Sequence, residues 1–261
     1  MAKRKRLTRI TAGRYVEAIL YDQPMPNDPP KTRAAKQKVS SAARQKINRR
    51  TCWQKCELAI AANFDARDLF VTLTYREAPA TREQSLRQLN EFIRKLRKAR
   101  AWRGQKLLCI KNAEHLRDDG SEGRWHHHII VNATGRDYEE IRELWSAWGD
   151  NVDFEPLLDG RETYATRAQY LCKEKPPLGK QTWIPSRGLK KPKRESSLVD
   201  DSVTLSVESL PAGAVVLEKS EELNEWGHFV YIKYMLPLKP EGPDPRRRRG
   251  DGGLPLFSDL G

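Results

Sequence analysis

The sequence has no apolar run long enough to cross a bilayer, so a membrane-spanning segment is not expected. Its basic N-terminus, MAKRKRLTRI, is not followed by the apolar stretch of a signal peptide. The nucleotide-binding pattern G-x-x-x-x-G-K-S/T is also missing, since Gly179-Lys180 lacks the upstream glycine and precedes Gln181. These absences favour a cytoplasmic protein without a nucleotide-driven motor of its own.

Cysteine is scarce. The four cysteines, Cys52, Cys56, Cys109 and Cys172, do not form a disulfide framework for a chain of 261 residues, so we interpret them as reduced thiols. Cys52 and Cys56 are four residues apart and would share one face of a helix, which is compatible with half of a zinc site. Buried thiols are the preferred interpretation.

Acidic residues are outnumbered by basic ones. The chain has 48 Lys and Arg against 35 Asp and Glu, for a formal net charge of +13. A balance this basic favours a polyanionic partner, and nucleic acid before a membrane surface.

Hydrophobic periodicity predicts strands interspersed with helices, hence an α+β fold. The expected strands cover 13–22, 70–75, 107–115, 125–132, 203–207, 214–218 and 228–235, and the expected helices cover 40–62, a segment after a Thr81 cap, a segment capped by Asp137 and 166–175. We expect one domain at 10–238, a basic N-terminal arm at 1–9 and a disordered basic tail at 239–261.

Three consecutive histidines begin the expected strand WHHHIIVN. Residues two apart on a strand share a face, so His126 and His128 would project together and His127 would face the other way. Glu114 lies near the end of the preceding strand, where a hairpin would bring it beside them. A mixed set of two histidines and a carboxylate favours Mg²⁺ or Mn²⁺ over a closed structural zinc. The alternative is one structural histidine with the others solvated, but the paired spacing with Glu114 favours a metal site.

The helix TRAQYLCKE places Tyr170 and Lys173 one turn apart on one face. A tyrosine hydroxyl, with an ordinary pKa of about 10, is a poor nucleophile at neutral pH. A neighbouring ammonium group and a metal-bound phosphate would favour its attack. The Y-x-x-K pattern is common by chance, and Tyr170 alone would equally fit a core position. Near a two-histidine site in a basic protein, the pair points to phosphoryl transfer on DNA.

The order of these motifs resembles the HUH endonucleases, and specifically the rolling-circle replication initiators of phages and plasmids. NFDARDLFVTLTY (63–75) resembles their motif I, WHHHIIVN (125–132) motif II and YLCK (170–173) motif III. SRGLKKP (186–192) and YIKY (231–234) also look like phage-type members. The resemblance covers roughly residues 13 to 238. One departure is His127, because the middle position of the motif II triplet is usually apolar or aromatic.

The resemblance implies an HUH-type ferredoxin-like or RRM-like antiparallel sheet with helices packed on one face. It implies that Tyr170 attacks single-stranded origin DNA, leaving a 5′-phosphotyrosine link and a free 3′-hydroxyl, and that the strand is later rejoined. Lys173 would support the attack, and Glu114, His126 and His128 would hold the metal. A host polymerase and helicase in a bacterial cytoplasm would supply extension and unwinding. Tyr164 would lie about 240° from Tyr170 around a helix and is not expected to act as a second nucleophile.

Basic residues outside these motifs are candidates for DNA contact. They include the arm at 3–9 and a set on the helix at 40–62, namely Arg44, Lys46, Arg49 and Arg50. Trp183, near Arg187 and Lys190, fits a base-stacking platform, and a packed tryptophan fits equally well. Two rival functions stay open at this point. One is a single-tyrosine transposase or relaxase with the same chemistry, and the other is a sequence-specific DNA-binding protein without catalysis.

Overall fold

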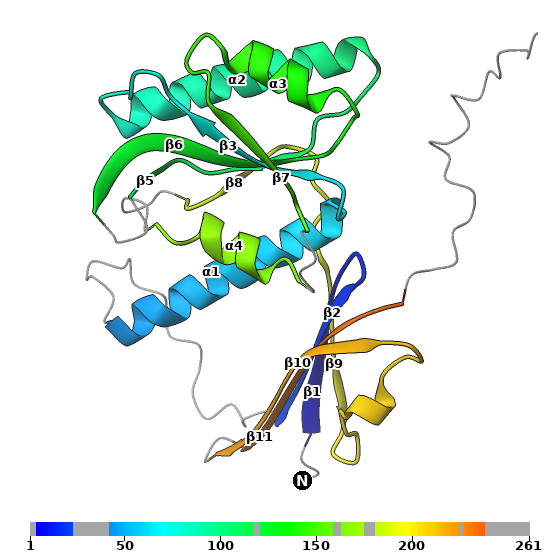
Figure 1. The fold of residues 1–261 in the computed structure, drawn as a ribbon. Coiled ribbons are helices and arrows are strands. Elements are labelled where there is room, and N and C mark those ends of the chain that lie inside the picture. The colour runs from blue at the N-terminus through cyan, green and yellow to red at the C-terminus, as the bar shows by residue number, and fades with distance from the viewer. Residues whose placement is uncertain are drawn as a thin grey trace, which may run out of the picture.

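A computed structural model describes residues 4–22, 42–116, 121–158, 163–174, 181–224 and 227–237. Its larger sheet has six strands in the order β7-β3-β6-β4-β8, with β5 also pairing to β6, and all pairs are antiparallel (Figure 1). The strands are β3 (Leu69–Thr74), β4 (Cys109–Lys111), β5 (Glu114–Leu116), β6 (Glu122–Val131), β7 (Val152–Pro156) and β8 (Ile184–Pro185).

Two helices pack on one face of this sheet. Helix α2 (Arg82–Trp102) connects β3 to β4, and α3 (Asp137–Trp145) connects β6 to β7. The resulting β-α-β-β-α-β succession is that of ferredoxin-like folds, as expected. Thr81 caps α2 through a hydrogen bond that its side chain accepts from the Gln84 amide. The core of this layer includes Leu89, Phe92, Trp145, Val71 and Ile129.

Two more helices cover the opposite face, whereas helices were expected on one face only. Helix α1 (Ala42–Asn63) and α4 (Ala165–Leu171) lie below the sheet in Figure 1. The reason lies in the strands, which are apolar on both sides: Phe70 and Ile130 face α1 and α4, while Val71 and Ile129 face α2 and α3. None of the helices in these described segments is both long and apolar enough to cross a membrane.

A second sheet of five antiparallel strands has the order β10-β11-β2-β1-β9. Its strands are β1 (Arg4–Ala12), β2 (Tyr15–Asp22), β9 (Lys193–Asp200), β10 (Val215–Asn224) and β11 (Gly227–Met235). The arm expected at 1–9 is therefore wrong for residues 4–9, which pair with both β2 and β9. The strand expected at 203–207 is instead an extended segment leading into a short 3-10 helix, Val207–Ser209. The predicted tail at 239–261 lies outside the described residues.

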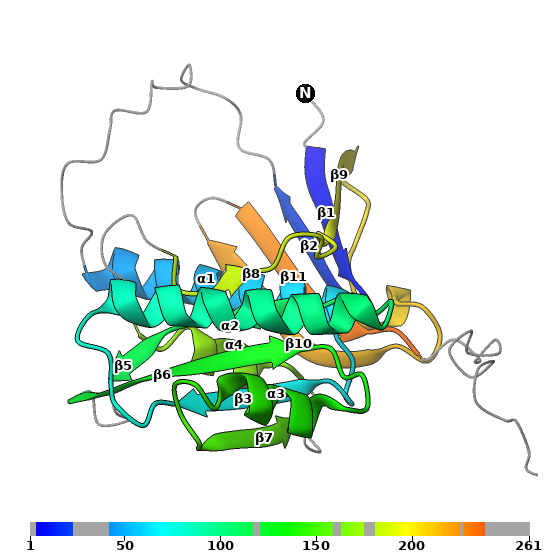
Figure 2. The same ribbon diagram turned by 90° about the horizontal axis from the view of Figure 1, so that it is seen from above.

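Helix α1 joins the two sheets. Figure 2 shows the strands of the second sheet extending away from it. Lys233 on β11 donates to Glu57 on α1 at 2.5 Å, and both side chains are buried. At the other end of the contact, Gly13 has a φ of +59°, and a Cβ there would lie 2.2 Å from the carbonyl oxygen of Ala61. Only glycine allows this approach of the β1–β2 turn to α1.

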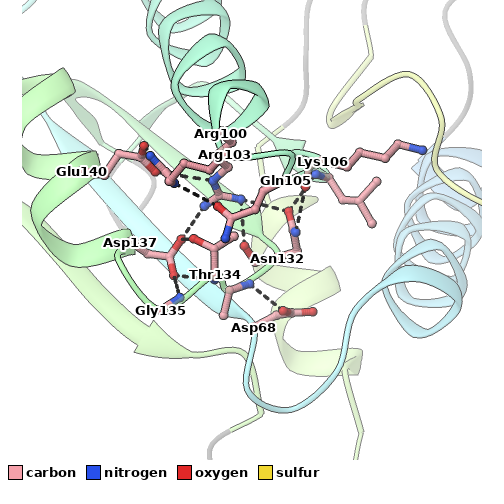
Figure 3. Close-up of polar contacts among 12 residues, drawn as sticks. Asp68, Arg100, Arg103, Gln105, Lys106, Asn132, Thr134, Gly135, Asp137 and Glu140 are labelled. Atoms are coloured by element: carbon pink, nitrogen blue, oxygen red, sulfur yellow. Dashed lines mark hydrogen bonds and ion pairs between the residues drawn. The ribbon is translucent and has the colours of Figure 1, made fainter. Parts of the chain in front are cut away.

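A buried polar cluster fixes the start of α3 at the far end of β6 (Figure 3). The fully buried Arg100 donates to the Asp137 carboxylate at 2.6 Å and to the main chain of Asn132 at 2.9 Å. Asp137 was expected as the N-cap of α3, but that position is Arg136. The Asp137 carboxylate instead accepts bonds from the amides of Thr134 and Gly135. The cluster therefore holds the β6–α3 turn against α2.

Candidate metal and tyrosine site

The two expected histidine ligands lie on one face of β6, toward α1 and α4. His126 is directly opposite Glu114 on β5, and His128 is directly opposite Thr72 on β3. Ligand atoms of Glu114, His126 and His128 all lie within 4.8 Å of one another. The structure thus brings together the three residues that the sequence predicted.

Hydrogen bonds orient both imidazole rings. Nδ1 of His126 lies 3.0 Å from the carbonyl oxygen of Arg124, which can only accept, so this nitrogen is the proton donor. Nδ1 of His128 lies 3.1 Å from the Thr72 hydroxyl. In both rings Nε2 is therefore the nitrogen left for a ligand, an arrangement that second-shell partners typically impose on metal-binding histidines.

The three side chains fit a divalent cation. Both carboxylate oxygens of Glu114 and Nε2 of His128 are buried, and none has a hydrogen bond of standard geometry to the described part of the chain. Their close contacts are His128 Nε2 to Glu114 Oε2 at 3.4 Å and Lys173 Nζ to Glu114 Oε1 at 2.5 Å. Buried acceptors that converge in this way are what a bound cation would satisfy.

Electrostatics keep the ligands in their metal-binding protonation states. Burial raises the pKa of Glu114, but His128 and Lys173 lower it by more, so the net pKa lies below its ordinary value. Burial lowers the pKa of His128, with Glu114 opposing it. At neutral pH the carboxyl group is therefore ionised and the imidazole is neutral, as metal coordination requires.

Tyr170 lies against this set of ligands. Its ring meets the His128 ring edge-on with centroids 4.8 Å apart, and it contacts Phe70 in the same manner at 6.1 Å. Lys173 follows the end of α4 and holds its ammonium group 4.4 Å from the centre of the Tyr170 ring. The expected one-turn pairing is present. Lys173 also reaches Glu114, so it links the tyrosine helix to a metal ligand.

Two hydrogen bonds that the sequence did not predict dock the end of α4. Asn112, between β4 and β5, donates through Nδ2 to the Leu171 carbonyl at 2.9 Å. The amide of His115 donates to the Glu174 carboxylate at 2.7 Å. Thr72 could have been found from strand pairing opposite His128, but Asn112 carried no signal beyond being a polar residue in an apolar segment.

His127 points to the opposite face, as strand alternation predicted. It is fully buried, with Nε2 2.7 Å from the Tyr75 hydroxyl and Nδ1 3.2 Å from the Asn112 carbonyl. Burial lowers the pKa of His127 to about 3, so the ring is neutral. It is a core histidine with partners on both nitrogens.

The cysteines lie apart from this site. Within the described segments, the only cluster of three or more metal-ligating side chains is Glu114, His126 and His128. Cys52 lies 3.6 Å from Cys172, sulfur to sulfur, and the thiols of both are free. The hydrogen bond from Cys172 and burial raise the pKa of Cys52 far above its ordinary range. Tyr164 is also a core residue, and its hydroxyl donates to the Phe64 carbonyl.

The expected DNA contacts are spread over several surfaces. The side chains of Arg44 and Lys46 lie outside the described set, while Arg49 and Arg50 are exposed on α1, with Arg50 3.3 Å from Glu218. Arg187 and Lys190 are exposed on the segment after β8. Trp183 is partly buried against the core shared by α1 and α4, which favours the packing alternative.

Comparison with known proteins places the site inside a recognised region. Residues 68–175 match the model of a family of replication-associated proteins, the ORF2 type. This region runs from the start of β3 past the end of α4 and contains all of the metal-ligand candidates, Tyr170 and Lys173. No curated protein and no solved structure shows significant similarity to the chain. The match covers less than half of the chain and supports a replication initiator.

Proposed function

We propose that this protein nicks single-stranded DNA at a replication origin by attack of the Tyr170 hydroxyl on a phosphodiester. The proposal is carried by one observation: the Tyr170 ring contacts His128, while Lys173 from the same helix pairs with Glu114. The family match across the same residues supports a role in replication. HUH-type chemistry is the specific form that we assign to it.

In the proposed step the Tyr170 oxygen forms a bond to phosphorus and the bond from phosphorus to the 3′-oxygen breaks. The phenolic proton leaves to solvent, and the 3′-oxygen takes up a proton to become a free hydroxyl. One phosphodiester is exchanged for another, so a 3′-hydroxyl can later reverse the reaction and rejoin the strand. A host polymerase would extend the 3′-end, and a host helicase would unwind the template.

Glu114, His126 and His128 would hold a divalent cation, Mg²⁺ or Mn²⁺ by the mixture of oxygen and imidazole ligands. When bound, such an ion supplies Lewis-acid polarisation of the phosphate. Thr72 fixes the His128 ring, and Asn112 holds the helix end that carries the nucleophile. The Lys173 ammonium group adds positive charge beside the tyrosine, where negative charge develops during attack.

The experiment is incubation with Mn²⁺ and single-stranded origin DNA, followed by denaturing electrophoresis. We expect a covalent protein–DNA adduct with the natural chain and with Tyr164→Phe, and none with Tyr170→Phe, His126→Ala or His128→Ala. All variants should still bind DNA, because affinity comes from the basic residues. Binding without any adduct from the natural chain would instead support the non-catalytic DNA-binding alternative.

A further inference from the structure

Trp102 is an unusually open aromatic side chain. It is the last residue of α2 and is 85 % exposed, whereas Trp145 is fully buried and Trp183 packs against the core. A single exposed apolar residue needs no explanation by itself. Its surroundings give this one a role.

Cations surround Trp102 on its own segment. Arg97 and Lys98 are exposed on the last turns of α2, and Lys106 follows the helix. Arg97 lies close enough to β4 for its charge to act on the pKa of Cys109, which burial raises. These side chains therefore border the edge of the larger sheet where β4 pairs with β8.

A second basic segment lies along the same edge. The Ser186 amide donates to the Cys109 carbonyl at 2.7 Å, which aligns the segment 186–192 with β4. A Cβ on Gly188 would lie 3.1 Å from the Lys106 ammonium group, and Figure 3 shows the Lys106 side chain pointing away from the polar cluster. Asn63 holds the segment from the other side, accepting from the Lys190 amide at 2.6 Å.

The charge of this edge is of one sign. No acidic residue occurs in 92–106 or in 184–194, while Arg187 and Lys191 are exposed on the second segment. Fixed main-chain bonds hold cations from two distant stretches on one surface, so little order has to be imposed on binding. Such a surface complements a chain of phosphates.

We propose that this edge binds single-stranded DNA, with Trp102 stacked on an unpaired base and the cations on the flanking phosphates. The residues are Arg97, Lys98, Trp102, Lys106, Arg187 and Lys191. An exposed indole ring can stack on a base only when that base is not already stacked in a duplex, which favours a single strand. The choice of DNA rests on the proposed function.

This surface is separate from the tyrosine site. Helix α2 starts shortly after β3, whose last residue Thr74 is opposite His126, and it ends where Arg100 meets Asn132. A helix of 21 residues spans about 30 Å. The edge would therefore hold the strand at a distance from the nick.

The test measures the Kd of an oligothymidylate of about 30 nucleotides by fluorescence anisotropy at several salt concentrations. Trp102→Ala should raise Kd roughly 5- to 100-fold with an unchanged salt slope, and Trp102→Phe should retain most of the affinity. The triple variant Lys98→Ala, Arg187→Ala, Lys191→Ala should lower the slope by about 2, since each phosphate on a single strand contributes about 0.7. The matched control removes three exposed cations elsewhere: Arg67→Ala, Arg136→Ala and Lys219→Ala.

Three results would overturn the inference: natural affinity in Trp102→Ala, an equal loss in the control triple, or a duplex bound as tightly as the single strand. The adduct assay reads the proposed nicking independently. Oligothymidylate binding with these dependences but no adduct would uphold this surface and refute the nicking. An adduct without these dependences would do the reverse.

Discussion

At the scale of single residues, the site depends on which nitrogen of each histidine is held. Thr72→Val removes the hydroxyl beside Nδ1 of His128 while keeping the branched shape that suits a strand. We expect Mn²⁺ affinity to fall about tenfold, in the range for lost second-shell partners. Isothermal titration with Mn²⁺ measures this, and Thr74→Val on the same strand is the matched control. Equal affinities for both variants would show that Thr72 does not orient the ligand.

His127 is the residue for which the structure changes the expectation most. Strand alternation alone predicts that His127→Leu is harmless, because the side chain faces away from the metal site. Its two hydrogen bonds are buried, however, so leucine leaves the Tyr75 hydroxyl and the Asn112 carbonyl with one partner fewer. We expect the free energy of unfolding to fall by about 1–3 kcal/mol in urea denaturation. Metal affinity of the folded variant should stay within twofold of the natural chain.

The same residue predicts a pH dependence of stability. The pKa of His127 is lowered to about 3 in the folded chain, against an ordinary value of about 6.5 when unfolded. Below pH 6.5 the unfolded state takes up a proton that the folded state refuses, so this contribution is complete above pH 6.5 and is lost toward pH 3. Urea denaturation at pH 7 and pH 5 should show a smaller loss for His127→Gln than for the natural chain. Equal losses would contradict the assignment.

At the scale of elements, periodicity predicted the site but not its support. A period of two placed His126 and His128 together, and one helical turn placed Tyr170 beside Lys173. Neither rule reports what lies across a sheet or between distant segments. β1 was interpreted as an arm because its partner β9 follows more than 180 residues later, as Thr8 opposite Ser196 illustrates. The apolar run on β3 was likewise ambiguous between one covered face and two.

The docking of α4 gives a prediction at this scale. Asn112→Ala removes the bond from Nδ2 to the Leu171 carbonyl and should loosen the end of the tyrosine helix. We expect faster hydrogen exchange in 168–172 and roughly tenfold slower adduct formation, since nucleophile position controls the rate. Mn²⁺ affinity should change little, because Asn112 contacts no metal ligand side chain directly. Uniformly faster exchange across β6 as well would mean that Asn112 supports the fold rather than the helix.

At the scale of the whole molecule, the N-terminal segment is part of the second sheet. An arm could be removed without structural effect, whereas deletion of 1–9 takes most of β1 from between β2 and β9. We expect this deletion to lower the melting temperature and expose the second sheet to limited proteolysis. A truncated chain with natural melting behaviour would restore the arm interpretation.

The nucleophile is the central claim, and peptide mapping of the trapped adduct tests it most directly. The adduct formed with Mn²⁺ and single-stranded origin DNA is digested with nuclease and protease, and the nucleotide-bearing peptide is sequenced by mass spectrometry. The account predicts a 5′-phosphate ester on Tyr170, in the peptide that also contains Lys173. A nucleotide on Tyr164, or on any residue other than Tyr170, would contradict it.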